Sequence, residues 1–326
     1  MQRREFITLF GAAATWPFAA RAQQPGMPVV GFLHSAAPDN AEPLVAAFRQ
    51  GLKEGGYVEG ENVALEFRWA QDHFDRLPAM ATDLVRRQVS VIATMGGTYS
   101  NLAAKAATTT IPIVFNTGAD PVKMGLVTSL NRPEGNITGV SFFAEELGSK
   151  QLGLLHELVP NVTVVGLLVN PNNPETPRQS AATLEAARVL GLQLYLVNAS
   201  SPDGIDKAFD ALVEGRAGAL LIGADAFFGN RVDQLVGLAA RYRMPTMYNL
   251  REYTEAGGLV SYGTSIKDAY RQAGIYVARI LKGAKPGDLP VMQSTRFEFV
   301  INLKTAKALG IDVSPGLSAR ADAVIE

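Results

Sequence analysis

The chain has 326 residues, 47% of them hydrophobic and 19% charged, so it can bury a sizeable core and is long enough for two domains of ordinary size. Its formal net charge of -1 gives no general attraction to a phosphate backbone and argues against nucleic acid as the main partner. Cysteine is absent, which excludes disulfides, thiolate metal sites, cysteine nucleophiles and lipid anchors on cysteine.

The N-terminus has the features of an export signal. Arg3 and Arg4 form a positive segment, an apolar run follows from Phe6 to Ala20, and Ala20-Arg21-Ala22 forms an A-x-A cleavage site. The run is too short and wrongly flanked for a spanning helix. We therefore expect a cleaved signal peptide over residues 1–22. The twin arginine resembles the twin-arginine export signal, with the general secretory route and a buried N-terminal helix as alternatives.

Short β-branched segments alternate with longer amphipathic ones from residue 28 onward. We expect strands at Pro28–Leu33, Val63–Arg68, Val89–Thr94, Ile111–Phe115, Gly139–Phe142, Val162–Val169, Leu192–Val197, Ala217–Ile222, Pro245–Tyr248 and Gly258–Tyr262. We expect helices at Glu42–Gly55, His73–Arg87, Tyr99–Thr108, Glu145–Leu158, Pro174–Leu190, Gly204–Glu214, Asn230–Tyr242 and Ile266–Lys282. Asp120 followed by Pro121 also predicts a helix start, with Asp120 as its cap.

The strand pattern predicts an α/β fold with two parallel sheets. The run Val162–Val169 is apolar on both faces, which is typical of a strand covered by helices on both sides. About five βα units precede Gly139 and about five follow it, which indicates two similar Rossmann-like lobes with a ligand cleft between them. Because no Ser/Gly-rich linker separates the halves, we expect a hinge and not a flexible tether.

Ligands in open parallel sheets lie at the carboxyl ends of the strands, where helix N-termini converge. The residues that follow each expected strand are rich in hydroxyls, amides, glycines and aromatic rings, with few charges. From these positions we take as candidate ligand-binding residues Ser35, Gly97, Thr98, Tyr99, Asn116, Thr117, Ser141, Phe142, Asp225, Phe227, Tyr248 and Tyr262.

Two of these positions suggest a specific chemistry. The turn Gly96-Gly97-Thr98 precedes an expected helix, whose free N–H groups and dipole favour a carboxylate or another small anion. Alternatively, the glycines only turn the chain and Thr98 only caps the helix. Asp225 follows a strand and can accept a hydrogen bond from a ligand ammonium, or it can be a helix cap. The candidate aromatic rings line either an apolar slot or the core.

Motifs for other activities are missing from the sequence. It contains no Walker motif, no G-x-G-x-x-G after a strand, no G-x-S-x-G elbow and no H-E-x-x-H. The three histidines are His34, His73 and His156, of which only His34 stands at an expected strand end. We therefore expect no cofactor, no metal and no enzymatic activity.

The chain resembles a known family, the ABC-transporter substrate-binding proteins of the type I periplasmic-binding fold, in the branch related to binders of tryptophan and other aromatic amino acids. The resemblance covers nearly the whole mature chain. The segments that carry it are Val30–Leu33, Phe48–Leu52, Gly55–Tyr57, Phe67–Ala70, Asp120–Val122, Gly125–Val127, Ser129-Leu130, Arg132-Pro133, Gly135–Gly139 and Val300–Gly310.

The resemblance implies two lobes joined by three crossovers. The first lobe would hold residues 27–138 and about 264–285, and the second residues 139–263 and about 286–326. It also implies a small-molecule ligand in the cleft and an ABC permease of the inner membrane as partner. The Gly96-Gly97-Thr98 turn matches the place where relatives hold an α-carboxylate, and Asn116, Thr117, Ser141 and Asp225 are carried over by position. Without a cysteine for a lipid anchor, we expect a free, monomeric protein in the periplasm.

The expected mechanism is capture by hinge closure. The expected ligand is an amino acid, and the resemblance to binders of aromatic amino acids implies an aromatic one. It binds one lobe first and is then buried between both, with its carboxylate at Thr98 and its ammonium at Asp225. Two alternatives stay open. One is an exported doubly wound hydrolase or isomerase, which turnover of a metabolite would reveal. The other is a periplasmic ligand sensor.

Overall fold

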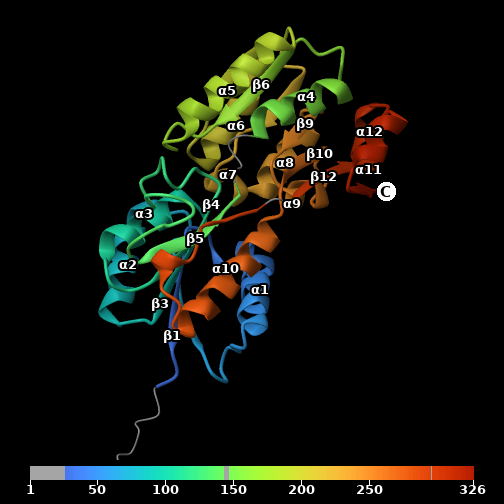
Figure 1. The fold of residues 1–326 in the computed structure, drawn as a ribbon. Coiled ribbons are helices and arrows are strands. Elements are labelled where there is room, and N and C mark those ends of the chain that lie inside the picture. Colours follow the sequence, from blue (N-terminus) through green and yellow to red (C-terminus); the bar gives the residue numbers. More distant parts are fainter. Residues whose placement is uncertain (1–25, 143–146, 295) are drawn as a thin grey trace, which may run out of the picture.

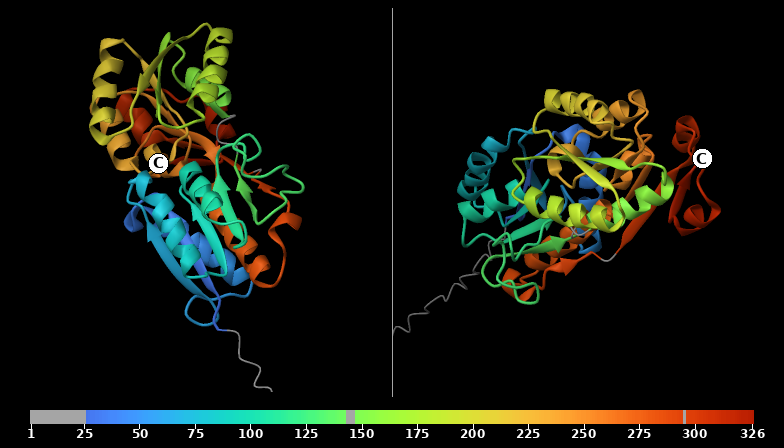
Figure 2. Two further views of the ribbon diagram at one scale, coloured as in Figure 1. Left: turned by 90° about the vertical axis from the view of Figure 1, so that its left-hand side faces the viewer. Right: turned by 90° about the horizontal axis from the view of Figure 1, so that it is seen from above.

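The computed structural model describes residues 26–142, 147–294 and 296–326, so the expected signal peptide and the expected helix start at Glu145 lie outside the described residues. Two sheets with flanking helices form two lobes, one above the other in Figure 1. Figure 2 shows the two lobes from two further sides. The predicted α/β fold with two lobes is confirmed.

The first sheet is entirely parallel, in the order β11-β5-β4-β3-β1-β2. Its strands are β1 (Val29–His34), β2 (Ala64–Trp69), β3 (Val91–Met95), β4 (Ile113–Thr117), β5 (Ile137–Ser141) and β11 (Met292–Gln293). One face is covered by α1 (Pro38–Glu54) and α10 (Ile266–Leu281), and the other by α2 (Leu77–Arg86) and α3 (Thr98–Ala107). The short helices η1 (Phe74–Arg76) and η3 (Pro286–Asp288) lie in its connections.

Glycines let α1 and α10 pack with their backbones in close contact. A Cβ added at Gly51 would lie 1.9 Å from the carbonyl oxygen of Arg271, and one added at Gly274 would lie 2.2 Å from that of Phe48. Neither distance is possible for a real side chain. The close approach holds a late segment of the chain, α10, against the first lobe.

The second sheet has the order β13-β12-β10-β9-β8-β6-β7. Its strands are β6 (Val164–Val169), β7 (Gln193–Asn198), β8 (Ala219–Ile222), β9 (Thr246–Tyr248), β10 (Val260–Thr264), β12 (Phe297–Asn302) and β13 (Ala323–Ile325). The helices α4 (Gly148–Leu158), α5 (Thr176–Val189), α11 (Leu303–Leu309) and α12 (Pro315–Arg320) pack on one face. The helices α6 (Pro202–Glu214), α7 (Ala226–Gly229), α8 (Val232–Arg241) and α9 (Arg251–Glu255) pack on the other.

The expected parallel sheets are confirmed for most strands, whereas one expected helix start was wrong. Strand β12, which lies beyond the last strand expected from the sequence, runs antiparallel to β10. The chain enters β12 directly from β11 in the first sheet, so this strand starts at the side where its neighbours end. Asp120 does not begin a helix. Its carboxylate accepts hydrogen bonds from the N–H groups of Val122 and Lys123 within a series of turns.

The chain passes between the sheets after β5, after β10 and after β11. These crossing segments lie side by side. Thr264 Oγ1 donates to the carbonyl of Phe142 at 2.9 Å, and the N–H of Ser294 donates to the carbonyl of Ser141 at 2.9 Å. The boundary expected after residue 138 falls inside β5, and β11, expected in the second lobe, belongs to the first sheet.

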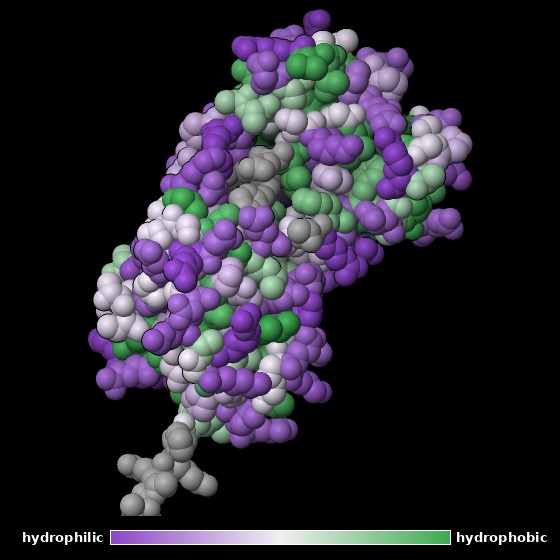
Figure 3. All heavy atoms as spheres, viewed as in Figure 1, coloured by the Kyte–Doolittle hydropathy of each residue, from purple (hydrophilic) through white to green (hydrophobic). Residues whose placement is uncertain are grey.

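On the face shown in Figure 3, hydrophilic residues cover most of both lobes and hydrophobic ones are scattered. In the described ranges, no helix has both the length and the hydropathy needed to cross a bilayer.

Candidate functional site

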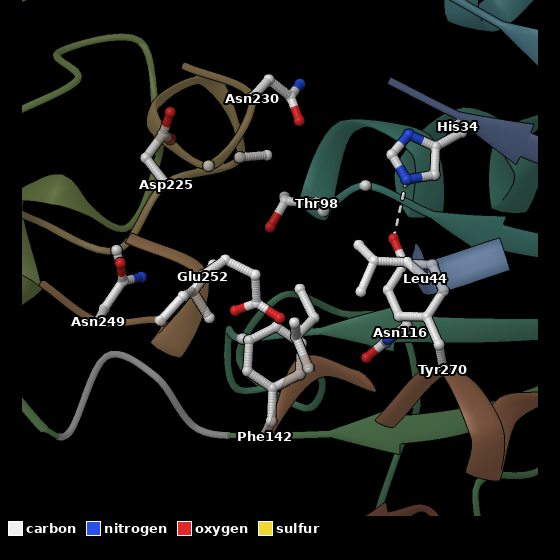
Figure 4. A pocket seen from close by; sticks show the side chains of 18 of the residues that line it. His34, Leu44, Thr98, Asn116, Phe142, Asp225, Asn230, Asn249, Glu252 and Tyr270 are labelled. Atoms are coloured by element: carbon white, nitrogen blue, oxygen red, sulfur yellow. Dashed lines mark hydrogen bonds between the residues drawn. The ribbon is translucent and has the colours of Figure 1, made fainter. Parts of the chain in front are cut away.

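A cavity of about 280 Å³ lies between the lobes, at the carboxyl ends of strands from both sheets. The first lobe contributes Gly96–Tyr99 and Asn116, and α10 adds Ile266 and Tyr270. The second lobe contributes Asn173, Asp225, Asn230, Asn249 and Glu252. Both lobes thus supply polar groups to one cavity, and Figure 4 shows Asn116 and Tyr270 on the side opposite Asp225 and Asn249.

The first wall is built around the start of α3. Gly96 and Gly97 have φ values of 79° and 99°, a region that favours glycine. A Cβ on Gly96 would lie 2.5 Å from Ser35 Oγ, whose hydroxyl donates to the Gly96 carbonyl at 2.7 Å. The turn therefore needs glycine here and is held by Ser35. The first turn of α3 follows and lines the cavity at Thr98 and Tyr99, and its N–H groups have no acceptors inside the helix.

His34 and Tyr270 lie beside this turn and are both buried. His34 Nε2 is 2.8 Å from Tyr270 Oη, and the N–H of Ala36 donates to His34 Nδ1 at 2.9 Å. Burial lowers the pKa of His34 to about 3, so the ring is neutral. The pair joins β1 to α10 at the cavity wall.

Asn116, at the end of β4, is 2% exposed and lines the cavity. Among the described residues, neither its Nδ2 nor its Oδ1 has a hydrogen-bond partner. An unpaired buried amide is destabilising, by about 1–3 kcal/mol. A donor and an acceptor at the cavity wall are therefore available to a bound molecule.

Asp225 lies on the opposite wall and caps α7. Its carboxylate accepts hydrogen bonds from the N–H of Phe227 at 2.8 Å, from Asn170 Nδ2 at 3.0 Å and from Asn173 Nδ2 at 2.8 Å. Burial raises the pKa of Asp225, and these hydrogen bonds oppose that rise. Asp225 is thus a helix cap that also faces the cavity.

Glu252, in α9, was not among the sequence candidates. Its carboxylate points into the cavity in Figure 4, and Lys267 Nζ lies 3.9 Å from Glu252 Oε1. Burial raises the pKa of Glu252, against the opposing effects of its own backbone N–H and of Lys267. Asn249 directly follows β9 and Glu252 lies three residues further on, so a search confined to the strand ends does not reach this acid.

Six of the twelve candidate residues line the cavity: Gly97, Thr98, Tyr99, Asn116, Phe142 and Asp225. The other six support its walls or lie in a core. Thr117 Oγ1 accepts from the N–H of Ala119, and Ser141 Oγ donates to the Ala119 carbonyl. Phe227 and Tyr248 pack in the core of the second lobe, Tyr262 packs against Phe297 and Phe299, and Ser35 holds the glycine turn.

Hydrogen bonds and an ion pair within the chain join the two lobes beside the cavity. Asp72, after β2, accepts a hydrogen bond from Asn230 Nδ2 at 2.6 Å and pairs with Arg231 Nη1 at 3.0 Å. Tyr99 Oη donates to the carbonyl of Asn172, across the same gap. We call the group of Asp72, Asn230 and Arg231 the interlobe clasp.

No cluster of three or more His, Cys, Asp or Glu side chains is placed to hold a metal ion in the described part of the chain.

One family model and several known proteins match this chain. A family model described as ABC transporter substrate binding protein matches residues 32–325. A tyrosine-binding protein of Clostridioides difficile is 27% identical over 262 residues, which are 80% of this chain and 75% of that protein. A conserved domain protein of Vibrio cholerae, 26% identical, superposes with a TM-score of 0.83 over 91% of this chain and 99% of that one. An ABC domain from Streptococcus pneumoniae, crystallised with L-Trp, is 24% identical with a TM-score of 0.82 over the same shares.

Proposed function

Since the chain belongs to the family of ABC transporter substrate-binding proteins, we propose that it captures an α-amino acid outside the cytoplasm and delivers it to an ABC importer. Substrate-binding proteins of ABC transporters work outside the cytoplasm, which agrees with the export signal read from residues 1–22. The mature protein is then a free, monomeric periplasmic protein whose partner is a permease of the inner membrane.

The observation that carries the ligand class is the opposite character of the two cavity walls. The first lobe offers the N-terminal turn of α3 and the unpaired amide of Asn116, which suit a carboxylate. The second lobe offers the carboxylates of Asp225 and Glu252, which suit an ammonium group. A molecule with both charges, spanning from one wall to the other, satisfies both lobes at once. A zwitterionic amino acid is the simplest such molecule.

Size and side chain restrict the ligand further. A volume of about 280 Å³ is near the lower end for ligand pockets, about 300–1,000 Å³, which favours one amino acid over a peptide. Leu44, Phe142, Leu250 and Ile266 line the remaining wall and suit an apolar or aromatic side chain. The name of the tyrosine-binding relative supports an aromatic one.

Capture proceeds by closure of the two lobes about the crossing segments. We assign residues 27–142 and 265–294 to the first lobe and residues 147–264 and 296–326 to the second. The ligand shifts the protein toward the closed form because only that form presents both walls to it. Release to the permease requires reopening. The protein releases the ligand chemically unaltered, so it binds without turnover.

The first test is a titration of purified protein with the twenty common L-amino acids, by thermal shift and then by calorimetry. We expect one or a few of them, with apolar or aromatic side chains, to bind. The variant carrying both Thr98→Val and Asp225→Ala should lose this binding. Unchanged affinity in the double variant would refute the site assignment, and chemical conversion of a ligand would refute binding without turnover.

A further inference from the structure

The protonation state of His34 can be deduced from its neighbours. The N–H of Ala36 donates to Nδ1 at 2.9 Å, so Nδ1 carries no proton. Because the buried ring is neutral, its one proton lies on Nε2. The hydrogen bond of 2.8 Å between His34 and Tyr270 therefore has a direction: His34 Nε2–H donates and Tyr270 Oη accepts.

The Tyr270 hydroxyl consequently has to donate elsewhere. Burial raises the pKa of Tyr270, and the backbone of Gly96 beside it opposes that rise. A phenol oxygen that accepts from His34 keeps its own proton for another acceptor. Tyr270 is 2% exposed and lines the cavity beside the glycine turn, and Figure 4 shows its hydroxyl at that wall.

We propose that Tyr270 is a ligand-binding residue that donates a hydrogen bond to the carboxylate of the bound amino acid, and that His34 is a positioning residue that fixes the direction of this bond. The inference rests on the proposed function and adds one side-chain donor to the α3 wall. The imidazole nitrogen that faces the phenol carries a proton and cannot accept one, so the hydroxyl proton of Tyr270 is available to the cavity. Such a site prefers a charged carboxylate over a neutral group of the same shape.

The test compares each acid with its amide. Calorimetry on the mature protein gives the dissociation constants of three pairs: L-tyrosine and L-tyrosinamide, L-tryptophan and L-tryptophanamide, and L-leucine and L-leucinamide. In Tyr270→Phe, we expect affinity for the acid to fall about 10- to 100-fold, as for a hydrogen bond to a charged group. The amide should be affected less, so the ratio of the two dissociation constants should shrink.

A matched control exists on the same helix. Tyr276 also lies in α10, but its hydroxyl donates to the carbonyl of Pro290 at 2.8 Å and not into the cavity. Tyr276→Phe should leave the acid-to-amide ratio unchanged. His34→Phe leaves Tyr270 in place but removes the donor that fixes the orientation of its hydroxyl, so it should reduce the acid-to-amide ratio. In a Tyr270→Phe background, His34→Phe should have no further effect on that ratio. It also serves as the second variant if Tyr270→Phe folds poorly.

The outcomes separate this inference from the proposed function. If the wild type binds an acid but Tyr270→Phe leaves the ratio unchanged, or weakens acid and amide equally, the role of Tyr270 is refuted and the proposed function stands. If the wild type binds none of the twenty common L-amino acids, the proposed function fails and this inference fails with it. If it binds an acid other than these three, the same comparison is made with that acid and its amide.

Discussion

The interlobe clasp allows ligand affinity to be changed without changing any residue of the cavity wall that binds ligand. Asp72 joins the first lobe to Asn230 and Arg231 of the second, and the side chains of Asp72 and Arg231 are 17% and 19% exposed. If the lobes separate on opening, these contacts exist only in the closed form. Replacing Asp72 by Ala therefore destabilises the closed form relative to the open one.

The size of the effect follows from the burial of the pair. Exposed ion pairs contribute about 0–1 kcal/mol, and hydrogen bonds to charged groups about 1.5–3 kcal/mol. Opening hydrates both charges, which offsets part of the gain, so we expect a loss of about 1–2 kcal/mol. Apparent affinity falls with the fraction of closed protein, so Asp72→Ala should bind about 5- to 30-fold more weakly.

Calorimetry gives this affinity, and stopped-flow fluorescence should place most of the change in faster ligand release. Asp75→Ala is the matched control, since it removes an exposed carboxylate three residues along the chain. Equal affinities of Asp72→Ala and the wild type would refute the reasoning, and so would an equal loss in Asp75→Ala.

Three further predictions concern other residues. The pKa of His34 is lowered to about 3, so between pH 6.5 and 3 the unfolded chain binds a proton that the folded chain does not, and stability falls as the pH drops. From pH 7 to pH 5, the free energy of unfolding measured in urea should fall by about 2 kcal/mol more for the wild type than for His34→Phe. Parallel pH profiles of the two proteins would contradict this. Glu252→Gln should weaken binding of the amino acid about tenfold in calorimetry. In the wild type, Glu255 Oε1 lies 2.7 Å from Arg251 Nε, so Glu255→Gln should weaken binding less than Glu252→Gln does. Equal losses of affinity in the two variants would contradict the assignment of Glu252. Gly237→Ala in α8 adds a Cβ that meets no described atom within 4 Å and should stabilise the fold by about 0.5–1 kcal/mol in urea unfolding, whereas a loss would contradict this.

The local sequence pattern was sufficient to predict a residue's place where that place depends only on the residue's own segment. The apolar run around β6 predicted a doubly covered strand, and Asn116 was found because it stands at a strand end. The glycine pair before α3 was found because its conformation is a property of the turn itself.

Sequence reasoning failed where long-range chain paths decide. The direction of β12 depends on the side from which the chain enters the second sheet, which periodicity does not encode. Tyr270 lies on the buried face of a helix, where an aromatic residue is usually core, and only the return of α10 to the first lobe brings it to the cavity. Glu252 was missed because it lies a helical turn beyond its strand.

The return of α10 to the first lobe has a consequence for synthesis of the protein. The face of the first sheet that carries Val30 and Phe32 is covered by α1 and by α10, and α10 begins only at Ile266. On the ribosome, nearly the whole second lobe therefore emerges before the first can be completed. A nascent chain that stops short of this helix leaves an apolar surface open, so the two lobes become native almost together at the end of translation.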